Sequence, residues 1–226
     1  VAFGFSLAFG EDVGGFIGNP ATFFMFKDVG AKVDTYLAPT IPLALYALFQ
    51  MKFAIITPSL ITGSFAERVR FSAYLVFMIL FCIFVYCPLA HWTWHPHGFL
   101  RQLGVVDFAG GIVVHASSGV AALTGAIFLG RRKQQDHHDP ANIPFVILGA
   151  AMLWLGWFGF NAGSSLAADS VAIKAFLNTN TASATAMMAW IFFDCLRGRK
   201  PSAMGAAIGA VVGLVAITPS AGYVTV

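Results

Sequence analysis

Charged residues are scarce in this chain, which is 10% charged and 58% hydrophobic. Soluble globular domains carry about 25% charged residues, so this scarcity argues against a soluble domain. The mean hydropathy of +0.77 points the same way. The net charge of +3 comes from small basic clusters between apolar runs, which do not predict nucleic-acid binding. The composition indicates an all-α, polytopic membrane protein.

Cysteine is also scarce, with three residues in the 226 of the chain. Cys82, Cys87 and Cys195 lie in or beside apolar runs and have no Cys-x-x-Cys spacing. This pattern argues against a disulfide framework and against a cysteine metal site. We expect three buried, reduced thiols.

Long apolar runs, in contrast, fill most of the sequence. Six of them reach roughly the 20 residues that a transmembrane helix needs; they are 39–63, 71–91, 107–130, 145–165, 171–196 and 203–219. Residues 1–10 predict the end of a further span, and residues 11–38 predict a polar loop. We therefore expect one transmembrane domain over residues 1–226, with six full spans and cut at both ends.

Basic residues predict the orientation of these spans. They gather after the first, third and fifth spans, at Arg68, Arg70, Arg131, Arg132, Lys133, Arg197, Arg199 and Lys200. By the positive-inside rule these loops are cytoplasmic, and residues 131–139 are expected to form a solvated cytoplasmic loop. Asp107 and the loop containing Trp92 and Trp94 then face outward.

The segment DFAGGIVVH at 107–115 places an ionisable imidazole inside a membrane-length apolar run. At about 1.5 Å per residue, His115 is expected roughly 12 Å beyond Asp107, near the middle of the bilayer. A polar group at that depth is typical of a substrate or ion pathway, and a buried histidine bonded to a neighbouring helix is the alternative. Asp107 is predicted to cap the helix, and its charge would also attract a cation.

Aromatic and hydroxyl residues recur at helical spacing near this segment. Phe49 and Phe53 lie one turn apart, as do Phe160 and Ser164, so each pair is expected to share a helix face. Trp94 is expected near the outer surface. Aromatic faces attract a desolvating cation, and a hydroxyl accepts a hydrogen bond. Packing or lipid contact is the alternative role for such residues.

Three histidines, His91, His95 and His97, cluster in the motif HWTWHPH. Neither a cysteine nor a carboxylate is near them in the sequence, and Pro96 prevents a regular helical face of ligands. We therefore expect no metal site and no other cofactor. Lys52 lies in the middle of the first span, where it is expected to face protein or to extend towards the membrane surface.

Five longer motifs together resemble the ammonium transporter (Amt/Mep/Rh) family, on its Amt side. They are ALFQMKFAIITPSLITGSFAERVRF at 47–71, AHWTW at 90–94, DFAGGIVVH at 107–115, GWFGFNAGS at 156–164 and GLVAITPSAGYV at 213–224. The resemblance implies a helix bundle of about eleven spans in two inverted halves, assembled as a homotrimer with one pore per subunit. The segments Ile56–Ser59 and Ile217–Ser220 have the same sequence and lie on spans expected to run in opposite directions, as an inverted repeat would require. Chance similarity between Gly- and Ala-rich spans is the alternative. The resemblance implies that the chain holds about half of a pore.

The resemblance also implies a role for each candidate residue. Phe49, Trp94 and Ser164 would line an outer ammonium recruitment site, with Asp107 supporting it. Phe53 and Phe160 would form a phenyl gate below that site. His115 would be the first of two pore histidines, the second lying beyond Val226. The cation would lose its proton, and ammonia would pass through a hydrophobic pore.

Three functions follow from these patterns. The resemblance favours ammonium transport for nitrogen uptake, in a multi-pass protein of the plasma membrane, and the motif wording points to a bacterial inner membrane. An ammonium sensor on the same scaffold is the second function. A membrane-embedded metalloenzyme using the three histidines is the third, and we expect no enzyme. The expected partners are ammonium or ammonia, membrane lipid, two further copies of the subunit and a small nitrogen-regulatory signalling protein.

Overall fold

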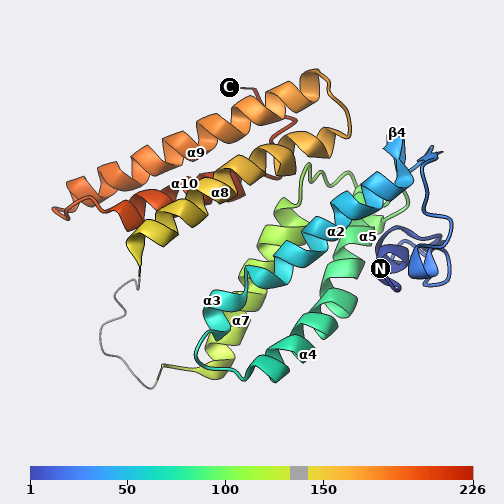
Figure 1. Cartoon of the computed structure of the whole chain (residues 1–226), viewed down its shortest axis with the longest axis horizontal. Helices are drawn as coiled ribbons and strands as arrows, with labels where there is room; N and C mark the ends of the chain where they lie inside the picture. The colour runs from blue at the N-terminus through green and yellow to red at the C-terminus, as the bar shows by residue number, and fades with distance from the viewer. Residues whose placement is uncertain (133–141, 226) are drawn as a thin grey trace. The chain divides into compact units, whose positions relative to one another are not determined.

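The computed structural model describes residues 1–132 and 142–225. They belong to two compact units, Val1–Lys133 and Gln134–Val226. Both units are mainly helical, as Figure 1 shows. Of the expected cytoplasmic loop at 131–139, the part from residue 133 onward lies outside the described residues.

The first unit begins with a short helix, where the end of a span was expected, and continues with two small hairpins and a 3₁₀ turn, where a polar loop was expected. Helix α1 covers Gly4–Phe9 and the 3₁₀ turn η1 covers Phe24–Phe26. Strand β1 (Asp12–Val13) pairs with β2 (Ile17–Gly18), and β3 (Val33–Asp34) pairs with β4 (Ala38–Pro42), both antiparallel. The all-α expectation therefore holds for the spans, while the loop contains short strands.

The apolar runs of the first unit form its long helices. They are α2 (Leu43–Ser59) with α3 (Thr62–Phe65); α4 (Phe71–Phe81), η2 (Cys82–Tyr86), α5 (Cys87–Trp94) and α6 (Phe99–Gln102); and η3 (Gly111–Ala116) with α7 (Ser117–Leu129). The turns η2 and η3 are π-helical. Helix α2 contacts η2, η3 and α7, and Figure 1 shows it alongside α5 and α7.

The described part of the second unit is a bundle of three helices. They are α8 (Ile143–Ala162), continued by the 3₁₀ turn η4 (Gly163–Ser165), α9 (Ser170–Leu196) and α10 (Ala203–Ile217). Helix α10 contacts both α8 and α9. Three glycines of α10, spaced by four residues, lie directly against α9; they are Gly205, Gly209 and Gly213. Small residues at this spacing allow two membrane helices to approach closely.

Four helical stretches among the described residues are long and apolar enough to cross a membrane. They are Leu43–Phe65, Phe71–Gln102, Gly111–Leu129 and Ile143–Ser165. Six spans were expected. Helix α9 is 27 residues long, but Asn178, Thr179 and Asn180 make it less apolar. Helix α10 is a shorter apolar helix of 15 residues.

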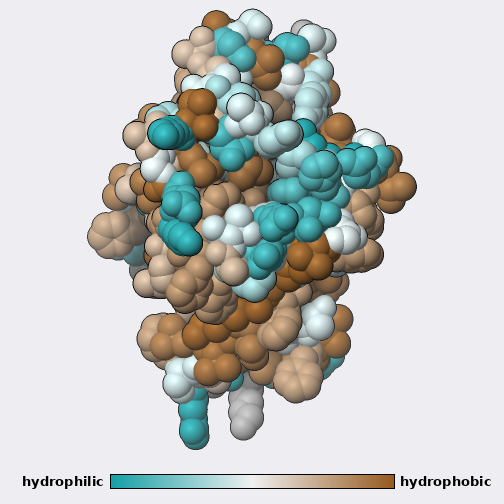
Figure 2. Space-filling view, turned by 90° about the vertical axis from the view of Figure 1, so that its right-hand side faces the viewer, coloured by the Kyte–Doolittle hydropathy of each residue, from teal (hydrophilic) through white to brown (hydrophobic). Residues whose placement is uncertain are grey.

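The surface and the interior have the polarity expected of a membrane protein. Large apolar side chains are exposed, and Phe128 and Phe145 keep 88% and 69% of their surface accessible. Figure 2 shows hydrophobic side chains over broad areas of one face. Polar side chains such as Thr57 and Thr218 are fully buried. Each of these two threonines donates its hydroxyl hydrogen to a backbone carbonyl one turn earlier, at 2.7 Å.

Candidate functional site

Three aromatic rings of the first unit lie in contact with one another. The Phe49 and Phe53 ring centres are 4.9 Å apart, nearly perpendicular, and the Phe53 and Trp94 ring centres are 5.5 Å apart at 74°. Phe53 is buried, whereas Phe49 and Trp94 are half-buried. The prediction that Phe49 and Phe53 share a helix face is confirmed, and α5 adds Trp94 to that face.

Asp107 caps the helix that follows it. Its carboxylate oxygens accept the backbone N–H groups of four residues at 2.7–3.2 Å; these are Gly110, Gly111, Ile112 and Val113. The side chain is buried. The positive end of the helix compensates its charge. The capping role predicted from the sequence is confirmed.

The expected start of the third span at residue 107 was wrong, because the helix begins at Gly111. Gly110 has a φ of +105°, a left-handed conformation that ends the preceding loop. His115 is therefore the fifth residue of the helix, whereas an unbroken helix from Asp107 would make it the ninth. The estimate of 12 Å from Asp107 assumed an unbroken helix and does not apply.

The loop before this helix is fixed to Trp94. The indole Nε1–H donates to the carbonyl of Asp107 at 3.0 Å, and the guanidinium of Arg101 donates to the carbonyl of Trp94 at 3.2 Å. A Cβ on Gly110 would lie 3.5 Å from the indole and 2.8 Å from a methyl of Val114. Asp107 and Gly110 thus position the tryptophan as well as the helix.

His115 lies on the π-helical turn η3. Its backbone N–H donates to the carbonyl of Gly110, five residues earlier, at 3.1 Å. The side chain is half-buried, and η3 contacts both α2 and α5. π-Helical turns are rare and frequently lie at functional sites. Of the seven candidate residues, the first unit holds five, namely Phe49, Phe53, Trp94, Asp107 and His115.

The other two candidates belong to the second unit. Phe160 lies near the end of α8 and Ser164 in η4, and the Ser164 hydroxyl donates to the Phe160 carbonyl at 2.9 Å. The Phe160 ring contacts that of Trp157, with centres 5.2 Å apart. The two residues lie within one turn of each other, as predicted. Their pairing with Phe53 and Trp94 stays a prediction.

Outside the aromatic group, Lys52 and Cys195 are exposed, so the expected burial of the Cys195 thiol was wrong.

The region around His91 contains a residue that sequence reasoning missed. The Nε2 atom of His91 lies 2.8 Å from a carboxylate oxygen of Asp12, which is 79 residues away in the chain. The HWTWHPH motif itself contains no carboxylate, so the local sequence does not indicate this contact.

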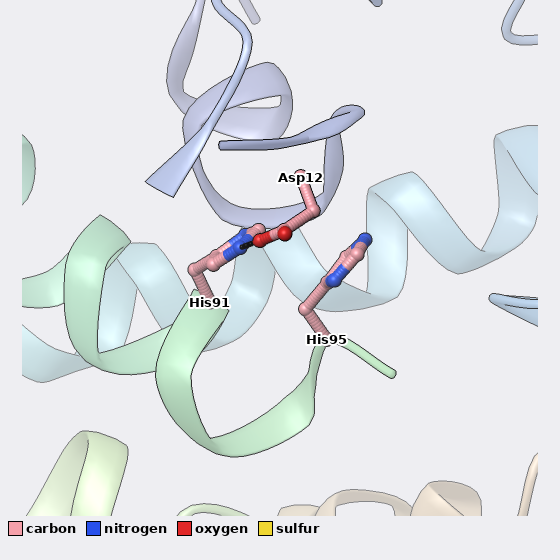
Figure 3. A group of neighbouring side chains, drawn as sticks. All are labelled: Asp12, His91 and His95. Atoms are coloured by element: carbon pink, nitrogen blue, oxygen red, sulfur yellow. Dashed lines mark hydrogen bonds and ion pairs between the residues drawn. The ribbon is translucent and has the colours of Figure 1, made fainter. Parts of the chain in front are cut away.

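The pKa of the Asp12 carboxyl is also shifted. Burial raises the pKa of its carboxyl, but hydrogen bonds from His91 and from the Gly15 N–H outweigh burial and leave the pKa below 3.8. These contacts tie the β1–β2 hairpin to the end of α5. Figure 3 shows Asp12 facing both His91 and His95.

These features define a polytopic helical membrane protein, with an aromatic group held beside a histidine-bearing π-helical turn. The chain belongs to the Ammonium Transporter Family, whose sequence profile matches residues 1–226. It is 49% identical over 225 residues to an ammonium transporter of Bacillus subtilis, covering 100% of this chain and 55% of that protein.

Solved structures agree with this membership. The crystal structure of Saccharomyces cerevisiae Mep2 is similar with a TM-score of 0.91 and 38% identity, over 99% of this chain and 51% of that one. A structure described as a sensor Amt protein is similar with a TM-score of 0.86 and 33% identity, over 98% and 56% of the two chains. The chain thus spans about half the length of the relatives it matches.

Proposed function

We propose that the protein to which this chain belongs carries ammonium across a membrane, as ammonia and a proton. The observation that carries the proposal is the contact series Phe49, Phe53 and Trp94, fixed by Asp107 beside the turn that bears His115. The name of the Bacillus subtilis relative, an ammonium transporter, supports it. In the proposal this membrane is the plasma membrane, which in a bacterium is the inner membrane.

Aromatic rings recruit the cation in the proposal, and the dry passage behind them separates ammonium from potassium. The faces of Phe49 and Trp94 attract a cation that has lost part of its hydration shell, and Ser164 supplies a hydroxyl acceptor. Ammonium and potassium ions are similar in size, so a cavity separates them poorly. Ammonium donates hydrogen bonds and can lose a proton, whereas potassium can do neither. A dry passage beyond the rings of Phe53 and Phe160 would exploit that difference.

His115 is proposed to line the passage below the rings. A neutral imidazole can accept a proton or hydrogen-bond to ammonia, depending on its tautomer. Asp107 acts indirectly, because its oxygens are occupied by backbone amides. Assembly as a homotrimer in lipid, and binding of a nitrogen-regulatory protein on the cytoplasmic side, complete the proposal.

An ammonium sensor on the same scaffold is the second candidate function. It is favoured by the similarity to the structure described as a sensor Amt protein. A sensor would bind ammonium without sustained flux, so vesicle transport separates the two functions. An enzymatic role is not proposed, since the relatives reported above are described as transporters or as a sensor.

Replacement of Trp94 by Leu in the full-length protein tests the proposed recruitment site. We expect ammonium recruitment to weaken by about tenfold, because a cation–π contact contributes roughly 1–2 kcal/mol, and we expect selectivity against potassium to relax. Trp92→Leu is the matched control, since its indole donates instead to the carbonyl of Phe16 at 2.7 Å. Unchanged selectivity in Trp94→Leu would remove Trp94 from the site.

A further inference from the structure

Asp12, His91 and His95 form a compact cluster apart from the aromatic group. Asp12 lies in β1, His91 in the last turn of α5, and His95 directly after that helix. Each offers one ligand atom, and these atoms all lie within 4.8 Å of one another. Figure 3 shows the three side chains converging from two separate segments of the chain.

The hydrogen bonds of His91 define which ring nitrogen carries a proton. Its Nδ1 lies 3.0 Å from the carbonyl oxygen of Ala8, and a carbonyl only accepts hydrogen bonds, so Nδ1 is protonated. In the neutral ring the lone pair is therefore on Nε2. That lone pair faces a carboxylate oxygen of Asp12 at 2.8 Å. The two atoms can share a proton in a hydrogen bond, and a metal cation bound to both could take the place of that proton.

The surroundings of the cluster have the features of a metal site. In such sites a ligating histidine donates its other ring N–H to a carbonyl or carboxylate, as His91 does to Ala8. The Gly15 N–H donates to both oxygens of Asp12, at 2.8 and 3.1 Å, and orients the carboxylate. The His95 ring is stacked on that of His91, with centres 4.4 Å apart and planes at 13°.

Access and distances also fit a metal ion. His91 is completely buried, but the Asp12 side chain is 23% exposed, and it borders a surface hollow lined also by Gly15, His97 and Phe99. Zinc binds nitrogen and oxygen ligands at about 2.0–2.2 Å, which places neighbouring ligand atoms about 3.4 Å apart in a tetrahedral site. Ligand atoms that lie up to 4.8 Å apart would therefore have to approach by roughly an ångström, and the His91 and Asp12 atoms, 2.8 Å apart, would have to separate slightly. The buried, fixed His91 would stay in place while His95 turns towards it.

We propose that Asp12, His91 and His95 bind a divalent transition-metal ion of the zinc class. Two imidazoles and one carboxylate suit zinc, cobalt or nickel better than magnesium or calcium, which prefer oxygen ligands. Water would fill the open position. The ion would join the β1–β2 hairpin to the end of α5, where His91 and His95 lie before and after Trp94 in the sequence. Its binding does not depend on the function proposed above.

The test uses full-length protein purified in detergent and stripped with a chelator. Zinc binding is measured by titration calorimetry, and cobalt binding by its visible absorption, which reports the ligand geometry. We expect one ion per chain in the wild type. Asp12→Asn and His95→Ala each remove one ligand and should weaken binding at least about 100-fold, since even loss of a supporting residue typically costs 10–100-fold.

His97→Ala is the matched control for these variants. His97 belongs to the same motif and is exposed, and the bond to His95 Nδ1 at 3.2 Å uses its backbone N–H, which the variant keeps. We expect His97→Ala to bind zinc like the wild type. Thermal unfolding of each metal-free variant shows whether its fold is intact.

Three results would overturn the proposal. The first is no stoichiometric zinc or cobalt in the wild type, which would show that a proton alone joins His91 to Asp12. The second is unchanged binding in folded Asp12→Asn and His95→Ala. The third is an equal loss in His97→Ala, which would show adventitious binding to surface histidines.

Discussion

At the scale of single residues, local patterns were predicted well and contacts between distant segments were not. The cap formed by Asp107 and the shared face of Phe49 and Phe53 depend on residues within one or two turns, so spacing revealed them. The contact of Asp12 with His91 joins residues 79 positions apart. A single sequence contains no periodicity that would indicate such a pairing.

Replacement of Asp107 by Ala should destabilise the protein severely. Four backbone N–H groups lose a charged acceptor, and each such bond contributes about 1.5–3 kcal/mol. We expect little folded protein, or a clearly lower melting temperature in detergent. Asp107→Asn keeps one acceptor oxygen and should fall between wild type and Asp107→Ala. Wild-type stability in Asp107→Ala would contradict the capping role.

At the scale of helices, the apolar runs predicted the positions of the long helices but not their irregular parts. The left-handed Gly110 places the start of the third span at Gly111, and neither this break nor the π-helical turn η3 has a periodicity that marks it in the sequence. The two ITPS segments are a clearer case. The threonine of each segment donates its hydroxyl hydrogen to the carbonyl four residues earlier, near the end of α2 and of α10. The repeated sequence therefore has the same local structure in each unit.

Close packing of α10 on α9 predicts that Gly213 cannot be enlarged. A Cβ there would overlap the carbonyl of Ala182 and lie 2.7 Å from the Cα of Ser183. Overpacking of this kind costs about 1–3 kcal/mol, so Gly213→Ala should lower the melting temperature. Gly156→Ala in α8 is the control, because its Cβ would meet nothing within 4 Å. Equal stability of both variants would contradict the close approach.

The start of α9 should be sensitive to acid. Asp169 accepts hydrogen bonds from the Ser165 hydroxyl at 2.6 Å and the Ala172 N–H at 2.8 Å. These bonds, that of Ser165 foremost, hold the pKa of Asp169 below its usual 3.8. The ionised cap therefore stabilises the fold above pH 3.8, and the stabilisation is lost as pH falls through the lowered pKa.

Thermal unfolding of Asp169→Asn at several pH values measures this effect. The variant should melt below the wild type at neutral pH, and the difference should shrink as the pH falls below 3.8. A difference that stays constant over that range would show that the charge of Asp169 has no part in capping α9.

At the scale of the whole molecule, composition alone predicted the membrane class, because burial in lipid changes which side chains a surface can expose. The five motifs identified the family, and the family comparison confirms it. Among the described residues, four of the six expected spans are both long and apolar enough to cross a membrane; α9 is long enough, but its polar residues lower its hydropathy. Phe53 belongs to the first unit and Phe160 to the second, so their pairing in a gate stays a prediction.

Current across proteoliposomes of the full-length protein, after an ammonium pulse, tests the central claim most directly. A potassium pulse and the variant His115→Ala are the controls. The account predicts a saturable, ammonium-specific current that is altered in His115→Ala. An ammonium current no larger than that of protein-free vesicles, or one unchanged in the variant, would contradict charge movement past His115.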